Sequence, residues 1–340
     1  MMNIYNFTQE KLEEYLIENG FKKYNASQII DFIYKKKIYD FNMMSNLSLK
    51  LREFCNSHFE VNDLKLITKE ESKLANKYLF ELSDGNKIEC VLMFHDYGNS
   101  LCISSQVGCN MGCAFCESGR LKKVRNLLTY EMVNQIISVE KLENIRIDYV
   151  VVMGIGEPFD NYDNIIDFLS ILTNNHMVGI GSRHITVSTC GIVPKIYEFA
   201  NLKNQVNLAI SLHAPNNVLR DKLMKINHAY KIEELIKAID YYISITNRRV
   251  TIEYIMLDGI NDTYDNALEL VNLFKGKLVY INLIPYNETS HFEFKRSSVF
   301  KINKFYDILK SNNINVTIRK EMGGELSAAC GQLRALKEGE

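Results

Sequence analysis

The chain has 340 residues, 46% of them apolar, and its 40 Lys and Arg residues against 41 Asp and Glu residues give a net charge of -1. This length accommodates one large α/β domain with a smaller appendage, and the balanced charge excludes a general electrostatic attraction to nucleic acid. No stretch approaches the ~18 continuous apolar residues of a membrane span, and the acidic N-terminal segment has no apolar signal region, which predicts a cytoplasmic protein.

The first part of the chain predicts helices followed by short strands. Apolar residues recur at helical spacing between residues 7 and 60, so we expect a small helical accessory domain over 1–60. From 61 to 98 the pattern changes to the β-rich runs KLITKE, KYLFEL and KIECVLMF, which are separated by turn signals. This segment predicts a β-hairpin connector.

From Leu101 onward, apolar strands alternate with amphipathic helices. The expected strands are LCISSQ, IDYVVVMG, HITVSTC, VNLAISLH, RVTIEYIML, KLVYINLIP and NVTIRK, and the expected helices are 129–142, 161–174, 194–201, 231–245, 262–275 and 298–312. Such an alternation favours a parallel sheet with helices outside it. About six βα units predict an α/β fold with a complete or partial barrel over 99–340.

Four of the eight cysteines lie within residues 102–116, which points to metal or redox chemistry in a reducing compartment. Cys109, Cys113 and Cys116 are spaced C-x3-C-x2-C in a loop rich in Gly and small residues. A zinc site normally takes four ligands, and no second Cys or His pair stands nearby at zinc-finger spacing. Three thiolates on a [4Fe-4S] cluster would leave one iron open to a ligand. Interleaved Gly and Asn residues argue against cysteines that serve only as small core residues.

With Phe115 before its last cysteine, this loop resembles the cluster loop of radical S-adenosylmethionine (SAM) enzymes. The wider sequence resembles the radical-SAM RNA adenine methyltransferases, the RlmN/Cfr family. The matching stretches are CISSQVGCNMGCAFC (102–116), MGIGEP (153–158), STCGIVPKI (188–196), SLHAP (211–215), MLDGIND (256–262), NLIPYN (282–287) and AACGQLR (328–334).

The resemblance implies a radical-SAM partial (β/α) barrel that binds a [4Fe-4S] cluster and SAM. It also implies methylation of adenine in RNA, at C2 or C8, as part of rRNA processing. The expected partners are 23S rRNA, tRNA and an electron donor such as flavodoxin or ferredoxin. C2 is favoured, because GEP and IPYN resemble the C2-methylating branch. IEYIML and the short length resemble the C8-methylating, antibiotic-resistance branch, which is the alternative.

Catalytic roles follow from the same resemblance. Cys109, Cys113 and Cys116 would hold the cluster, Cys330 would accept the methyl group, and Cys102 would form a transient disulfide with Cys330 as the product leaves. Glu89 matches the family's proton acceptor. Without the resemblance, the sequence predicts that Cys102 is a buried strand cysteine and Cys330 a small residue in helix packing. It predicts that Glu89 is an exposed strand carboxylate.

The residues that match the family's SAM contacts lie where predicted strands end. Barrel active sites are found at the C-terminal ends of strands, so these residues should share one face of the barrel. The predicted contacts are Gly156, Glu157, Ser188, Ser211, Leu212, His213 and Asn287.

Local basic groups are the candidates for RNA contact, although such groups are more often solvated surface. They are Lys35, Lys36 and Lys37, then Lys122, Lys123 and Arg125, then Lys295 and Arg296. The side chain of Tyr34 or Tyr39 could stack on a base of the RNA.

Two other classes of protein remain as alternatives. A non-catalytic iron-sulfur RNA-binding protein would have no reason to keep both Cys102 and Cys330. A radical-SAM enzyme of another reaction type would lack AACGQLR. The chain departs from the family pattern at Ile155 in MGIGEP and at Lys225 and Lys231, where relatives tend to have proline.

Overall fold

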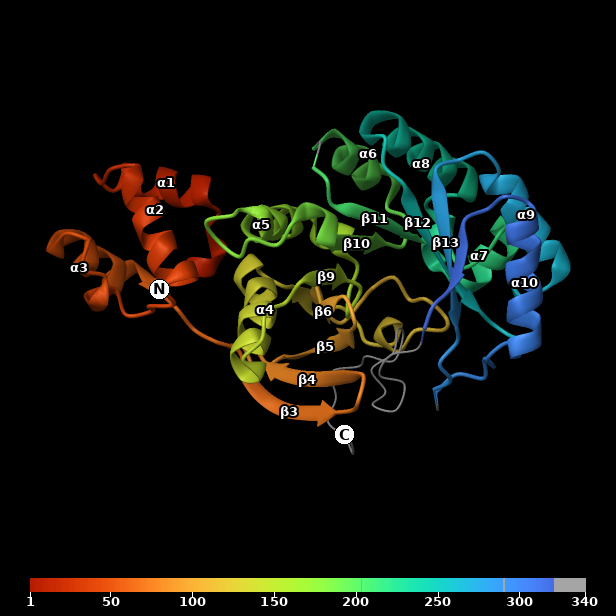
Figure 1. The fold of residues 1–340 in the computed structure, drawn as a ribbon, viewed down its shortest axis with the longest axis horizontal. Helices are drawn as coiled ribbons and strands as arrows, with labels where there is room; N and C mark the ends of the chain where they lie inside the picture. The colour runs from red at the N-terminus through yellow and green to blue at the C-terminus, as the bar shows by residue number, and fades with distance from the viewer. Residues whose placement is uncertain (203, 290, 321–340) are drawn as a thin grey trace.

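The computed structural model describes residues 1–202, 204–289 and 291–320, and the chain begins in a group of helices beside a long curved sheet (Figure 1). The helices are α1 Gln9–Glu18, α2 Tyr24–Ile30, the π-helical turn η2 Asp31–Lys35 and α3 Leu49–His58, with a short parallel pair formed by β1 Met2–Asn3 and β2 Phe59–Glu60. Thr8 and Ser48 cap α1 and α3 through their hydroxyls. Asn6 accepts a hydrogen bond from the Tyr130 amide (2.9 Å), which joins this group to the barrel.

Ten strands form one sheet, in the order β14-β13-β12-β11-β10-β9-β6-β5-β4-β3. Their bounds are β3 Lys65–Glu71, β4 Ala75–Glu81, β5 Lys87–His95, β6 Gly98–Cys102, β9 Tyr149–Val152, β10 Ile185–Thr189, β11 Asn207–Ser211, β12 Val250–Met256, β13 Val279–Pro285 and β14 Val316–Ile318. Within this sheet, neighbouring strands are parallel from β6 through β9, β10, β11, β12 and β13 to β14. The neighbours β3, β4, β5 and β6 are antiparallel. The expected α/β fold with a parallel barrel sheet is confirmed, and the strands of the connector segment extend that sheet.

Helices between the parallel strands cover the outer face of the sheet (Figure 1). They are α4 Thr129–Glu143, α5 Tyr162–Thr173, α6 Val193–Asn201, α8 Ile232–Thr246, α9 Tyr264–Phe274 and α10 Val299–Ser311. The short helix α7 Asn217–Leu223 instead packs through Leu223 in a second apolar cluster with Phe115. The 3-10 helices are η1 Ile4–Asn6, η3 Phe41–Met43, η4 Glu117–Gly119, η5 Pro158–Asn161, η6 Ser182–His184 and η7 Lys225–His228. Val150, Val187 and Leu208 belong to the same buried apolar cluster as the inner faces of these helices. The inner face of the sheet is thereby left for the site.

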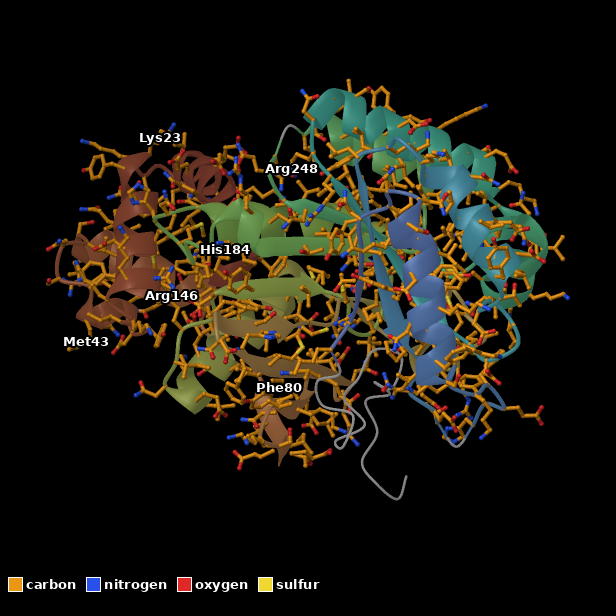
Figure 2. All side chains as sticks on the ribbon, turned by 45° about the vertical axis from the view of Figure 1, so that its right-hand side comes forward. Lys23, Met43, Phe80, Arg146, His184 and Arg248 are labelled. Atoms are coloured by element: carbon orange, nitrogen blue, oxygen red, sulfur yellow. The ribbon has the colours of Figure 1, made fainter. Side chains whose placement is uncertain are left out.

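The two edges of the parallel sheet are distinct. Arg146, His184 and Arg248, labelled in Figure 2, precede β9, β10 and β12 and mark the N-terminal edge. The loops that follow the strands form the opposite edge, where the cysteine loop lies. Among the described residues, no helix has both the length and the apolarity needed to cross a membrane.

Candidate active site

The cysteine loop is closed by a small antiparallel pair, β7 Gln106–Val107 with β8 Arg125–Asn126. The Cys109 amide donates to the Leu121 carbonyl (3.0 Å), and the Cys116 amide donates to the Cys113 carbonyl (3.3 Å). Gly108 has φ +73°, and a Cβ there would lie 2.2 Å from the Lys122 carbonyl oxygen. The loop therefore needs glycine at this turn.

The loop also packs against the far side of the barrel. Phe115 belongs to a buried apolar cluster with Met224 and Ile255, and the Ala114 amide donates to the Leu223 carbonyl at the end of α7 (2.9 Å). These contacts fix the loop over the C-terminal ends of the strands.

All three loop cysteines line one cavity. Its volume is about 880 Å³ when the solvent-filled space at its mouth is included. Burial raises the pKa of the Cys109 thiol to about 12 and also raises that of Cys113. Such thiols become thiolates readily only when a cation or metal centre is present. Three thiols on one loop at one cavity are a donor set that fits an iron-sulfur cluster with one iron left for another ligand. Among the described residues no three His, Cys, Asp or Glu side chains are close enough together to hold a single ion, so the assignment rests on the donor chemistry and the shared cavity.

The turn after β9 brings a carboxylate to the same cavity. Gly156 has φ +111°, and a Cβ there would lie 2.8 Å from the Gln106 amide nitrogen, so only glycine fits. Glu157 is 3% exposed and accepts hydrogen bonds from the amides of Cys190 (2.7 Å) and Phe159 (3.0 Å). Burial raises the pKa of Glu157, and these hydrogen bonds oppose the rise.

The turn after β11 places His213 against the cavity in a left-handed backbone conformation (φ +56°). Its Nδ1 accepts from the Ile255 amide (3.1 Å), and its ring meets Phe115 edge to face with centroids 4.9 Å apart. Burial, aided by the charge of Arg220, lowers the pKa of His213 to about 3. The imidazole is therefore neutral at physiological pH, and it fits a hydrogen-bonding role better than that of a proton donor.

The remaining predicted SAM contacts differ in position. Ser188 and Ser211 line the cavity, and their hydroxyl oxygens are 3.4 Å apart. The Leu212 side chain is fully buried in the outer apolar cluster, so only its backbone could reach a ligand. Asn287 is half-buried beyond the end of β13 and is not part of the cavity wall.

The predicted catalytic residues Cys102 and Glu89 lie on the same face of the sheet. Cys102 is paired with Val91 of β5, and Glu89 is two residues from Val91 on that strand. Cys102 is 7% exposed and Glu89 2%, with a 3.6 Å ion pair between Glu89 and Lys77. The interpretation of Glu89 as an exposed strand carboxylate is therefore wrong. Cys330 lies outside the described residues.

Several side chains near the cavity were missed by the sequence reasoning, including Arg319 of the cavity wall. Glu253 of β12 and Cys190 line it, and Arg220 of α7 lies fully buried behind it. A charged residue in the middle of the apolar run VTIEYIML is a signal that could have found Glu253, since alternation places it opposite the buried Ile252 and Tyr254. Arg220 stands in a short polar helix, and no sequence signal distinguishes it from a surface arginine.

A three-cysteine loop after the first parallel strand and a Gly-Glu turn after the second, both lining one cavity, define a radical-SAM enzyme. The family model described as "Radical SAM superfamily" matches residues 103–271. A second model, "Ribosomal RNA large subunit methyltransferase N-terminal domain", matches residues 2–61.

Full-length relatives make the assignment narrower. The chain is 51% identical to a "Probable dual-specificity RNA methyltransferase RlmN" of Spiroplasma citri over 343 residues, covering 100% of this chain and 99% of the relative. It is also 51% identical to the protein of that name from Acholeplasma laidlawii, covering 98% and 99%. The crystal structure of a radical SAM methyltransferase from Sphaerobacter thermophilus superimposes with a TM-score of 0.92 at 40% identity, covering 99% of this chain and 100% of that one.

The chain belongs to the RlmN family of radical-SAM RNA methyltransferases. Its cofactors are a [4Fe-4S] cluster and SAM, as in the superfamily that the barrel matches. Its macromolecular substrate is RNA.

Proposed function

We propose that the chain methylates C2 of adenine in 23S rRNA and in tRNA, through a methyl group carried on Cys330. The observation that carries the proposal is the cavity that Cys109, Cys113 and Cys116 share with Glu157 and His213. The "dual-specificity" name of the relatives supports two classes of RNA substrate. The GEP and IPYN stretches favour C2 over C8.

A radical route is required by the target atom. An sp2 C–H carbon of adenine is too weak a nucleophile to take a methyl group directly from a sulfonium. When bound, the cluster and SAM supply the radical chemistry, and the protein positions the reacting groups. Cys109, Cys113 and Cys116 would hold the cluster, and the buried Glu157 carboxylate would face the amino group of SAM. Ser188, Ser211, His213 and the Leu212 backbone would hold the rest of the SAM molecule, with Asn287 as a further proposed contact.

Three residues would complete the transfer. The Cys330 sulfur, as a thiolate, takes a methyl group from one SAM molecule. After hydrogen abstraction, that carbon would bond to adenine, and the one electron that the adduct must lose would pass to the bound cluster, so that Cys330 and the RNA are joined through one methylene. Glu89 takes the proton from the adenine carbon. The Cys102 thiolate would then attack the Cys330 sulfur to form a disulfide. The electron pair of the broken carbon–sulfur bond would pass to the methylene and adenine ring, and the methylene would take up a proton to become the methyl group.

Some of the side chains suggested for RNA contact already have partners within the protein. Lys123 pairs with Asp160 (2.7 Å), and Arg125 pairs with Glu131 (2.7 Å), so both stabilise the cysteine loop. Tyr34 has a buried hydroxyl and packs edge to face on Tyr5, so it is not placed to stack on a base.

All the other suggested lysines are exposed, but Lys36 pairs with Asp31 (2.9 Å) and Lys295 pairs with Glu288 (3.1 Å). Lys35, Lys37 and Lys122 therefore fit phosphate contact better. We propose residues 1–60 as the RNA-binding domain, 61–98 as a connector and 99–340 as the catalytic barrel. A flavodoxin or ferredoxin as electron donor and the cytoplasm as location complete the proposal.

Mass spectrometry of RNA tests the position of the methyl group. Purified, cluster-reconstituted protein is incubated with SAM carrying a deuterated methyl group, a reductant, and transcribed 23S rRNA or tRNA. We expect labelled 2-methyladenosine in both RNAs. Label at C8 would contradict the C2 assignment, and unlabelled RNA would favour the non-catalytic binding protein.

A further inference from the structure

A row of polar side chains crosses the inner face of the barrel at the level of the cavity. Ser188 of β10 and Ser211 of β11 approach to 3.4 Å, Ser211 is paired with Glu253 of β12, and Glu253 is paired with Asn282 of β13. The Asn282 amide donates to Oε2 of Glu253 (2.9 Å). Four neighbouring strands thus present hydroxyl, carboxylate and amide groups side by side.

Glu253 is the ionisable member of this row. It is 5% exposed, and in the described part of the chain Asn282 is the single hydrogen-bond donor to its carboxylate. Arg319 also lines the cavity and influences Glu253 through its charge. A buried carboxylate with one neutral donor costs free energy, so its presence at a cavity wall indicates a ligand that supplies further donors.

Among the described residues, no hydrogen bond is made to the other carboxylate oxygen of Glu253, Oε1. Asn282 holds Oε2, and Glu253 lines the cavity beside Ser211. A carboxylate accepts hydrogen bonds only, whereas a serine hydroxyl both donates and accepts. This combination suits a vicinal diol, whose two hydroxyls are donors at adjacent atoms. Dinucleotide-binding folds likewise use an acidic side chain to bind ribose hydroxyls.

We propose that Glu253, oriented by Asn282, accepts a hydrogen bond from the ribose hydroxyls of SAM and so makes binding depend on the ribose diol. This inference rests on the proposed use of the cavity as the SAM site. It adds a specificity-determining residue to that site and is distinct from the roles given to Glu157 and the two serines.

The test compares the affinities of SAM and of its 2′-deoxy and 3′-deoxy analogues by equilibrium dialysis under anoxic conditions. The cluster-reconstituted wild type should bind SAM about tenfold or more tightly than at least one deoxy analogue, because a hydrogen bond to a charged group is lost. Glu253→Gln should bind SAM about tenfold more weakly and bind that analogue within about twofold of the wild type. Glu253→Asp, which keeps the charge but shortens the side chain, should also lose most of the preference.

Two control variants distinguish a failure of this inference from a failure of the proposed SAM site. Glu269→Gln removes another half-buried carboxylate that accepts from an asparagine, Asn216 (2.8 Å), but lies on α9, and it should keep the wild-type preference. Equal weakening of SAM and the analogues in Glu253→Gln, or a wild type without preference, would overturn the inference. Unchanged SAM binding in Gly156→Val, whose side chain would fill the turn against Gln106, would instead overturn the proposed site.

Discussion

Replacement of Cys330 by Ala is expected to abolish RNA methylation, and replacement of Cys102 by Ala is expected to leave RNA joined to the protein. Without the Cys330 thiolate, no sulfur can carry the methyl group. Without Cys102, the carbon–sulfur bond of the joined species has no thiol to release it. Denaturing electrophoresis of the reaction with labelled RNA should show no crosslink for Cys330→Ala and a stable crosslink for Cys102→Ala.

A cysteine remote from the cavity provides the control for these two variants. Cys55 is fully buried in α3 among the N-terminal helices, so Cys55→Ala should give methylated RNA without a crosslink. Free methylated RNA at the wild-type rate from Cys330→Ala or Cys102→Ala would refute the assigned roles. A crosslink from Cys330→Ala would place the methyl carrier on another residue.

Replacement of Arg220 by Met should strongly destabilise the loops around the cavity. The fully buried guanidinium donates to the Cys190 carbonyl (2.6 Å), the Leu212 carbonyl (3.2 Å) and Oδ1 of Asn227 (3.0 Å). Arg220 thereby ties the turns after β10 and β11 to η7. Methionine leaves these acceptors buried without donors, so the free energy of unfolding should fall by on the order of 3 kcal/mol in urea denaturation.

The matching surface variant is Arg183→Met. Arg183 is exposed and donates to the Gln205 side chain (2.9 Å), so this change should alter the free energy of unfolding by less than about 0.5 kcal/mol. Arg220→Lys should fall between the two, since one ammonium cannot reach all three acceptors. A stability of Arg220→Met equal to that of Arg183→Met would show that the buried hydrogen bonds contribute little.

Local patterns in the sequence predicted most of the barrel. The six helices expected from residue 129 onward agree with the structure to within two residues at each end, because each has one apolar face that packs on the sheet. The helix α7 was missed, since seven residues are too few for a clear periodicity. The first parallel strand was expected to run from 101 to 106 but ends at Cys102, where the chain leaves β6 for the cysteine loop.

The site was less accessible to sequence reasoning, because its contacts cross between strands far apart in the chain. The family motifs predicted Glu157, Ser188, Ser211 and His213, which all line the cavity. Glu253 lies in the IEYIML stretch, but the comparison of branches did not mark it as a site residue, because its place at the cavity depends on the register of β11 and β12. Strand alternation also explains why the Leu212 side chain, adjacent to Ser211, points into the outer core.

The central claim is that Cys109, Cys113 and Cys116 hold a [4Fe-4S] cluster beside the SAM cavity. The most direct measurement is the iron and sulfide content, with the visible absorbance, of protein reconstituted without oxygen. We expect about four iron and four sulfide per chain in the wild type, and loss of both in the Cys109→Ala, Cys113→Ala and Cys116→Ala variants but not in Cys55→Ala. A wild type without iron-sulfur absorbance, or a full cluster in any of the three loop variants, would contradict this account.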